Sequence, residues 1–394
     1  MQGYPDEGGA TDAPEATARS GGFPATIAHQ FSPLDRGASA GEPPVASSGE
    51  GRDMRPDAVY GALDLGTNNC RLLLARPSRR GFRVIDAFSR IIRLGEGVSQ
   101  TGRLSEPAMA RTLDALKVCA SKLGRARVRR SRLVATEACR VAENGAEFLA
   151  RVRDKLGLEI EILTREVEAR LAVSGSAALV DSSCDYVLVF DIGGGSSELI
   201  LLDLTRRRRQ RDRRLDAQHC MVAWTSLPIG VVTLAERFGG RHVTAQDFEA
   251  MVAETMRLLA DFEQQHRVAE RLAGRRMHML GTSGTVTTVA GIQLGLKRYD
   301  RNRVDGCWLT VGDVRDVTGD LLGRSFEQRV AEPCIGRDRA DLVLAGCAIL
   351  EAILRMWPCE RLRVADRGLR EGILTTLMLE DGVLPAMRRR RRPV

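Results

Sequence analysis

Two short segments of the sequence have the residue types that bind phosphate. Each places an aspartate at the end of an apolar run and a glycine turn directly after it: DLGTNN begins at Asp64, and DIGGGSSE begins at Asp191. Glycine permits positive φ and lets backbone N–H groups approach an anion closely. One such turn alone would be an ordinary hairpin, but two on the same plan favour a phosphate site. The candidate phosphate-binding residues of the two turns are Gly66, Thr67, Asn68, Gly193, Gly194, Gly195, Ser196 and Ser197.

The acidic residues of these turns are candidates for a cation site. Mg²⁺ binds carboxylate oxygens and water and commonly bridges to phosphate oxygens. We therefore expect Asp64, Asp191 and Glu198 to hold Mg²⁺ or another divalent cation. The segments match neither a Walker P-loop nor a dinucleotide fingerprint, because no G-x-x-x-x-G-K-[ST] is present and a strand, not a helix, follows the glycines.

A third glycine turn lies in MLGTSGTVTTVAG, residues 279–291. This turn is predicted to run from a strand into a helix, and the N–H groups at a helix N-terminus attract anions. Gly281, Thr282 and Ser283 are thus further candidates for phosphate binding. A plain strand-to-helix turn with an N-cap fits the same residues equally well.

Hydrolysis of a phosphoanhydride also needs a group that orients or deprotonates the attacking water. Glu168, in TREVEARLA, is one candidate, although the residues alone do not distinguish it from Glu161 or Glu166. Arg140, on the expected loop after ATEAC, could clamp phosphate oxygens or could be a surface residue. The five histidines are isolated, and no Ser-His-Asp or Cys-His arrangement is evident.

Strands and helices alternate around these residues. Asp64 and Asp191 occupy matching places 127 residues apart, which predicts two domains of similar design facing one another. Strands are predicted over 58–65, 70–77, 81–95, 159–163, 186–193 and 197–204, a short strand running into a loop over 132–140, and helices over 106–123, 145–156, 166–179, 244–270, 311–323 and 339–357.

Composition narrows the class of protein. The chain has 394 residues, 43% of them hydrophobic, with no apolar stretch long enough to span a membrane and no secretory signal at its start. Nine scattered cysteines without a C-x-x-C pair predict a reduced, cytoplasmic protein without structural zinc. The net charge of +8 and the arginine clusters at 125–132, 206–214 and 388–392 suit an anionic partner, or are simply solvated surface.

Six segments taken in order closely resemble the exopolyphosphatase/guanosine pentaphosphate phosphohydrolase (Ppx/GppA) family. They are ALDLGTNNCRLLLA, ATEACRVAENGAEFL, EIEILTREVEARLA, VLVFDIGGGSSELI, SLPIGVVTL and MLGTSGTVTTVAG, and the resemblance runs from about Tyr60 to about Leu377. It implies an α/β, actin-like (ribonuclease H-like) duplicated two-domain fold with Mg²⁺ and substrate phosphates in the interdomain cleft. By position, Glu168 matches the family's catalytic glutamate and Arg140 an arginine that contacts phosphate. Val167 departs from the family's usual E-E-A-R.

The resemblance also suggests the layout of the chain. We expect a disordered extension over 1–56, an actin-like domain I over 57–180 and an actin-like domain II over 181–365. A C-terminal helix over 366–382 should return toward domain I, and a basic tail should occupy 383–394. Members of the family often form dimers.

The expected activity is release of terminal orthophosphate from inorganic polyphosphate, with guanosine pentaphosphate (pppGpp) hydrolysis as the alternative. An actin-like kinase or ATPase shares the acidic turns, but it should release ADP or a phosphorylated acceptor. A non-catalytic sensor of guanosine tetra- or pentaphosphate would have no need of Glu168. Neither a membrane nor a specific nucleic acid is expected as a partner.

Overall fold

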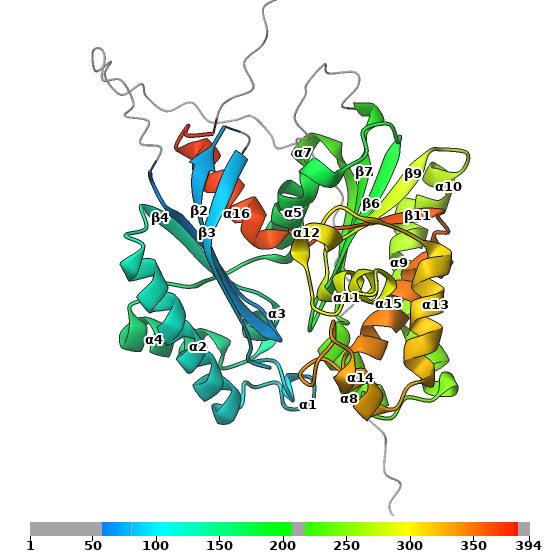
Figure 1. Cartoon of the computed structure of the whole chain (residues 1–394), viewed down its shortest axis with the longest axis horizontal. Helices are drawn as coiled ribbons and strands as arrows, with labels where there is room; N and C mark the ends of the chain where they lie inside the picture. The colour runs from blue at the N-terminus through cyan, green and yellow to red at the C-terminus, as the bar shows by residue number, and fades with distance from the viewer. Residues whose placement is uncertain (1–56, 80, 207–216, 385–394) are drawn as a thin grey trace, which may run out of the picture.

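The computed structural model describes residues 57–79, 81–206 and 217–384. Within these residues, two β-sheets form the centres of two lobes, and helices α5 (Arg165–Ser176) and α16 (Leu369–Glu380) lie between them (Figure 1). The predicted disorder of 1–56, most of the arginine run 206–214 and nearly all of the tail 383–394 fall outside the described residues. The domain boundaries proposed from the sequence stay predictions.

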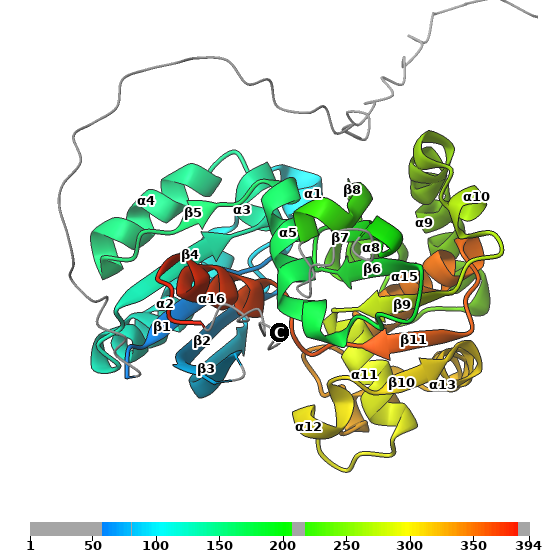
Figure 2. The ribbon, with the colours of Figure 1, turned by 90° about the horizontal axis from the view of Figure 1, so that it is seen from above.

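The first sheet is built around a buried central strand, β1 (Tyr60–Leu65). Every residue of β1 except Asp64 is buried, because helices cover both faces of the sheet (Figure 2). Helices α2 (Glu106–Arg125) and α4 (Gly145–Leu156) contribute to the apolar cluster on one face, and α16 packs on the other. The strand order is β3 (Gly81–Ile91), β2 (Asn69–Ser78), β1 (Tyr60–Leu65), β4 (Arg130–Ala135) and β5 (Glu161–Ile162), flanked by α2 (Glu106–Arg125) and α4 (Gly145–Leu156).

The second sheet repeats this plan. Strands β6 (Tyr186–Ile192) and β7 (Ser197–Asp203) pair antiparallel, as β1 and β2 do. Strand β6 also pairs in parallel with β9 (Met277–Gly281), as β1 does with β4. Asp64 lies opposite Arg71 in the first hairpin, and Asp191 lies opposite Glu198 in the second. The predicted duplication is therefore visible in the strand pairing. The strand order is β10 (Trp308–Thr310), β11 (Arg361–Val364), β9 (Met277–Gly281), β6 (Tyr186–Ile192), β7 (Ser197–Asp203) and β8 (Met221–Leu227).

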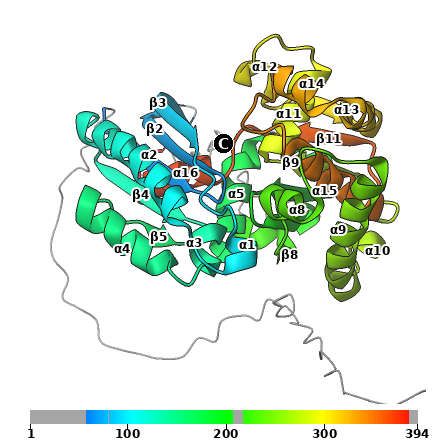
Figure 3. The ribbon, with the colours of Figure 1, turned by 90° about the horizontal axis from the view of Figure 1, so that it is seen from below.

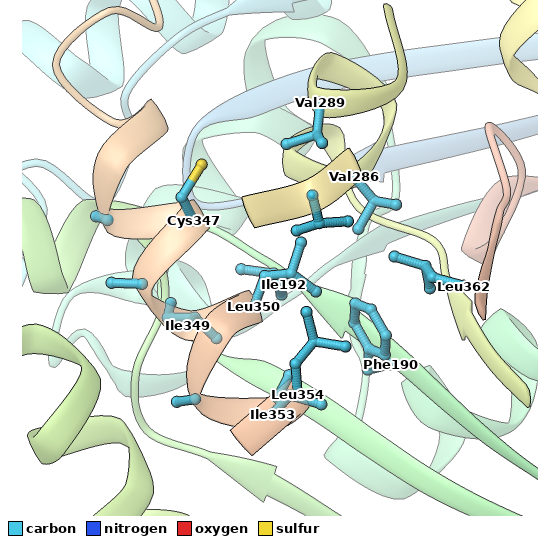
Figure 4. Close-up of a cluster of buried hydrophobic side chains, with 14 of the residues drawn as sticks. Phe190, Ile192, Val286, Val289, Cys347, Ile349, Leu350, Ile353, Leu354 and Leu362 are labelled. Carbon is cyan, nitrogen blue, oxygen red and sulfur yellow. The ribbon is translucent and has the colours of Figure 1, made fainter. Parts of the chain in front are cut away.

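An apolar core under the second sheet fixes the strand end that carries Asp191. Phe190 and Ile192 precede and follow Asp191 in the sequence, and both pack among buried residues of helices α11 (Gly284–Gln293) and α15 (Val343–Met356) (Figure 4). Burial of side chains of this size contributes about 1.5–3 kcal/mol each. The helices of this lobe are α8 (Val231–Phe238), α9 (Ala245–His266), α10 (Val268–Leu272), α11 (Gly284–Gln293), α12 (Arg301–Val304), α13 (Val311–Gly323), α14 (Phe326–Ala331) and α15 (Val343–Met356).

Most predicted elements are confirmed, and most of the errors concern short segments. The helix expected from 106 begins there because the side chain of Ser105 caps it. The expected loop at Arg140 is wrong, since residues 137–141 form helix α3 (Glu137–Val141). Strands β8, β10 and β11 were not predicted, and two of these have four residues or fewer. Short segments carry too little periodicity to be recognised. The remaining short helices are α1 (Val98–Thr101), η1 (Ala177–Leu179) and α7 (Ala217–Cys220).

Among the described helices, none combines the length and the apolar character needed to cross a membrane. All nine cysteines are free thiols, and seven of them are buried. Thiols at such positions pack as small hydrophobic side chains, as the sequence predicted.

Helices α5 and α16 pack backbone to backbone between the lobes. A Cβ atom on Gly372 would lie 2.0 Å from the carbonyl oxygen of Leu171, and one on Gly175 would lie 1.9 Å from that of Gly368. On α5, Ala169 and Val173 belong to the core of the second lobe, whereas Leu171 packs with the first. The glycines thus allow α5 to approach α16 closely while its side chains pack in the cores of both lobes.

Replacing Gly372 by Ala is expected to lower the free energy of unfolding by about 2 kcal/mol, because the new methyl group forces the two helix backbones apart. Urea denaturation would measure the loss. Gly319→Ala, in α13, is the matched control, since a Cβ there meets nothing within 4 Å. That substitution should stabilise the protein by about 0.5–1 kcal/mol. Equal effects of the two substitutions would contradict the close packing.

Candidate active site

The two predicted glycine turns meet across the cleft. A Cβ atom on Gly194 would lie 2.9 Å from Cβ of Thr67, and one on Gly195 would lie 3.0 Å from its Oγ1. The start of α8 supports the second turn. There, the N–H groups of Val231 and Val232 donate to the carbonyl oxygens of Gly193 and Gly194 at 2.9 and 2.8 Å. A side chain at either glycine would crowd Thr67, so this approach of the two lobes favours glycine.

A cavity of about 150 Å³ lies where the turns meet. Both turns, the first turn of α5 and the segment before α11 contribute to its lining. Thirteen of the predicted site residues line it: Asp64, Gly66, Thr67, Asn68, Glu168, Asp191, Gly193, Gly194, Gly195, Ser196, Glu198, Thr282 and Ser283. Residues more than 200 positions apart in the sequence are thereby brought to one place.

Three predicted residues do not line this cavity. The hydroxyl of Ser197 donates to the carbonyl oxygen of Ile229 at 2.7 Å, and it is buried between strands. Gly281 ends β9, where a Cβ would lie 2.7 Å from Cγ2 of Val286, so close packing accounts for this glycine. The third is Arg140, described below.

Ser283, which does line the cavity, also caps α11 by accepting from the N–H of Val286 at 3.2 Å.

The carboxylates in the cleft share a poorly hydrated space. Burial raises the pKa values of Asp64 and Asp191. Burial and the charge of Asp191 raise the pKa of Glu198 to about 7, although the hydroxyls of Ser196 and Ser226 donate to its Oε1 at 2.7 and 2.8 Å. Carboxylates that repel one another at low hydration are stabilised in their charged forms by a cation.

The oxygen-rich lining fits a hydrated divalent cation. The side-chain oxygens of Asn68 and Asn69 are buried beside the acidic strand ends and have no hydrogen-bond partner among the residues that the structure describes. No three His, Cys, Asp or Glu side chains of the described residues are placed to hold an ion by themselves. A cation here would complete its shell with water and with phosphate oxygens of the substrate, which is the usual manner for Mg²⁺.

Of the three glutamates that the sequence left open, Glu168 alone lines the cavity. It lies in the first turn of α5, which the side chain of Thr164 caps by accepting from the N–H of Val167 at 3.3 Å. Glu161 instead pairs with Arg132 at 2.6 Å, and Glu166 pairs with Arg170 at 2.6 Å. The glutamate that the family resemblance favoured is thus the one that lies at the cavity, and its catalytic role stays a prediction.

Arg140 holds Glu168 in place. Its Nη1 donates to Oε2 of Glu168 at 3.1 Å and to the carbonyl oxygen of Leu163 at 2.6 Å, and its Nε donates to Glu137 at 2.9 Å. Glu137 in turn accepts from Arg165 at 2.7 Å. Since these contacts occupy the guanidinium, direct contact of Arg140 with phosphate stays a prediction.

The protonation of Glu168 reflects this setting. Burial, followed by the charge of Glu198, raises the pKa of Glu168 well above its ordinary value, and Arg140 opposes the rise. A base with a raised pKa accepts a proton near neutral pH more readily than an exposed glutamate does. Val167, at the position of the first glutamate of the family's E-E-A-R, packs against an apolar cluster of the first lobe.

Two arginines of the site were missed by the sequence analysis. Arg71 and Arg339 line the cavity and also a second, adjoining cavity of about 470 Å³. Arg71 could have been found, because it lies on β2 directly opposite Asp64. Arg339 precedes α15, and no motif in the residues around it indicates a binding site. The second cavity adds Arg301, Arg367 and Arg370 to its lining, so it is suited to further anionic groups.

Two lobes of repeated strand order, with a glycine turn from each meeting in one cleft, define an α/β protein of the actin-like fold. A family model described as the Ppx/GppA phosphatase family matches residues 74–381. The chain belongs to this family. The prediction of the family is thereby confirmed, and the word phosphatase in its description agrees with the expected class of enzyme, a hydrolase.

Individual relatives agree with this assignment. Exopolyphosphatase 2 of Mycobacterium tuberculosis is 30% identical over 331 residues, which cover 80% of this chain and 97% of that protein. Guanosine-5'-triphosphate,3'-diphosphate pyrophosphatase of Photobacterium profundum is 29% identical over 332 residues, 81% of this chain but 59% of that longer protein.

Solved structures confirm the fold. The Aquifex aeolicus member of the Ppx/GppA family has 29% identity and a TM-score of 0.65, with 82% of this chain and 98% of that chain covered. An exopolyphosphatase from Cytophaga hutchinsonii has a TM-score of 0.72 over 83% of this chain and 100% of that one, at 23% identity.

Proposed function

We propose that this protein hydrolyses the terminal phosphoanhydride bond of inorganic polyphosphate and releases orthophosphate. The observation that supports this most directly is the convergence of Glu168 and both glycine turns on one cavity. The similarity to exopolyphosphatase 2 of M. tuberculosis, over nearly all of that protein's length, is a second support.

In the proposed reaction the turns hold the terminal phosphates. The N–H groups of Gly66 and Gly193 close their own turns by donating to Asn69 and Ser196. The N–H groups that follow them, of Thr67, Asn68, Gly194 and Gly195, would donate to phosphate oxygens together with the hydroxyl of Thr67, and Arg71 and Arg339 would offset the phosphate charge. Asp64, Asp191 and Glu198, directly or through bound water, would hold Mg²⁺, which supplies charge neutralisation and orientation of phosphate oxygens when bound.

Glu168 would take a proton from the attacking water. The carboxylate is held by Arg140 at the edge of the phosphate cavity, so a water beside it can attack the terminal phosphorus. As the P–O bond to the leaving phosphate breaks, negative charge develops on that oxygen. Positioning and electrostatic stabilisation supply most of the rate in phosphoryl transfer. The glycine turns would position the phosphates, and Arg71 and Arg339 would stabilise the developing charge.

The alternative substrate is pppGpp, from which the same attack would release the terminal 5'-phosphate. The similarity to the P. profundum pyrophosphatase favours it, as does the second cavity, which contains Tyr299 beside several arginines and has room for more than a phosphate.

Phosphate release from long-chain polyphosphate and from pppGpp, each with Mg²⁺, tests the proposal. We expect turnover of polyphosphate to be the faster. Preference for pppGpp would favour the alternative substrate. Binding of either compound without turnover would remove the hydrolase and favour a sensor, whereas release of ADP from ATP, with a phosphorylated acceptor, would favour a kinase.

A further inference from the structure

A loop of the first lobe reaches the second lobe on the side of the molecule away from α5 and α16. It follows β3 and leads into α1, which lies close to α8 of the second lobe (Figures 1 and 3). Arg93 of this loop donates from Nη1 and Nη2 to the two carboxylate oxygens of Asp341, both at 2.9 Å, and Nη2 also donates to the carbonyl oxygen of Asp338 at 3.1 Å. A bidentate pair of this kind fixes direction as well as distance.

The backbone of the same loop supports the first glycine turn. The N–H groups of Ile92 and Arg93 donate to the carbonyl oxygen of Asn68 at 2.9 and 3.1 Å, and the N–H of Gly95 donates to that of Thr67 at 2.9 Å. Arg93 has a φ of 47°, a conformation that is uncommon for residues other than glycine. The loop is therefore a defined connection between the phosphate turn and the Arg93 side chain.

Asp341, the acidic partner in the ion pair, is flanked in the sequence by residues that line the cavity. Asp341 lies two residues after Arg339, whose carbonyl oxygen accepts from the N–H groups of Leu342 and Val343 at 2.9 and 3.0 Å as α15 begins. Arg339, Leu342 and Val343 all line the phosphate cavity. Among the described residues the guanidinium of Arg339 has no ion-pair partner, and it borders both cavities.

We propose that Arg93 is a positioning residue: through Asp341 it sets the place of Arg339 opposite the first glycine turn, so that both bind the same phosphate chain. Arg93 itself does not line either cavity and acts through Arg339. A second contact spans the lobes nearby, where Glu236 of α8 accepts from the N–H of Gly97 at 2.8 Å and from the hydroxyl of Ser99 at 2.6 Å. The inference rests on the proposed function only for the choice of anion.

Calorimetric binding of inorganic tripolyphosphate, with steady-state kinetics beside it, tests the proposal. Arg93→Gln and Asp341→Asn should each weaken binding and raise KM about tenfold, with kcat changed less than about threefold. Arg339→Gln should weaken binding at least as much. In the Arg339→Gln background, adding Arg93→Gln should cause no further loss, because the residue that Arg93 positions is already gone.

Arg103→Gln is the matched control. Arg103 forms an exposed ion pair with Glu143 within the first lobe, at 3.0 Å, and its loss should leave binding unchanged. The proposal would be overturned if Arg93→Gln bound tripolyphosphate as tightly as the wild type. It would also be overturned if the losses of affinity of Arg93→Gln and Arg339→Gln multiplied in the double variant. If Arg93→Gln does not fold, Asp341→Asn decides by the same criteria. A wild type that hydrolyses nothing would remove the proposed function but leave this binding test intact.

Discussion

Replacing Glu168 by Gln is expected to lower kcat about 10³-fold and to leave the affinity for tripolyphosphate within about threefold of the wild type. The substitution keeps the shape of the side chain and can still contact Arg140, but an amide cannot accept a proton from water. The turns and arginines that would bind the phosphates are unchanged. Phosphate-release kinetics and calorimetry on the same preparation would separate the two quantities.

Glu166→Gln is the control for this experiment. Glu166 lies on the same first turn of α5, but it pairs with Arg170 at 2.6 Å outside the cavity. Its loss should change kcat less than about twofold, because this half-buried i,i+4 pair has no contact with the cavity. Near wild-type turnover by Glu168→Gln would assign the proton transfer to another group, and the proposed mechanism would fail.

The parts of the site that the sequence predicts are those encoded within a few neighbouring residues. An aspartate at a strand end and the glycines after it lie in one short segment, so DLGTNN and DIGGGSSE are visible without a structure. The structure places both turns at one cavity. The same holds for α2, whose start depends on Ser105 and the residues directly after it.

Features that depend on distant residues were not predictable. Arg140 was expected on a loop, and its contact with Glu168, 28 residues away, depends on the packing of α3 beside α5. The ion pair between Arg93 and Asp341 joins residues 248 positions apart. Arg339 is one arginine among many in the sequence, and only its position before α15 distinguishes it. Tertiary packing decides such contacts, and no local pattern records them.

The second large effect concerns Arg140. Arg140→Gln is expected to lower kcat by about 10²-fold, because it removes the charge-assisted hydrogen bond that orients Glu168 and leaves Glu137 and Glu168 without their shared cation. The affinity for tripolyphosphate should change little if Arg140 acts through Glu168, and should fall with kcat if it contacts phosphate directly.

The pH dependence of this variant gives the sharper test. Glu168 must be deprotonated to act as a base, so activity should rise as the pH increases through its pKa. Burial raises that pKa, and the positive charge of Arg140 lowers it. Removing the charge should raise the pKa further, and the acidic limb of the kcat profile should move to higher pH. Arg170→Gln, whose partner Glu166 lies outside the cavity, should leave the limb in place. An acidic limb that moves to lower pH in Arg140→Gln would mean that another group titrates, because loss of a neighbouring cation cannot make a carboxylic acid stronger.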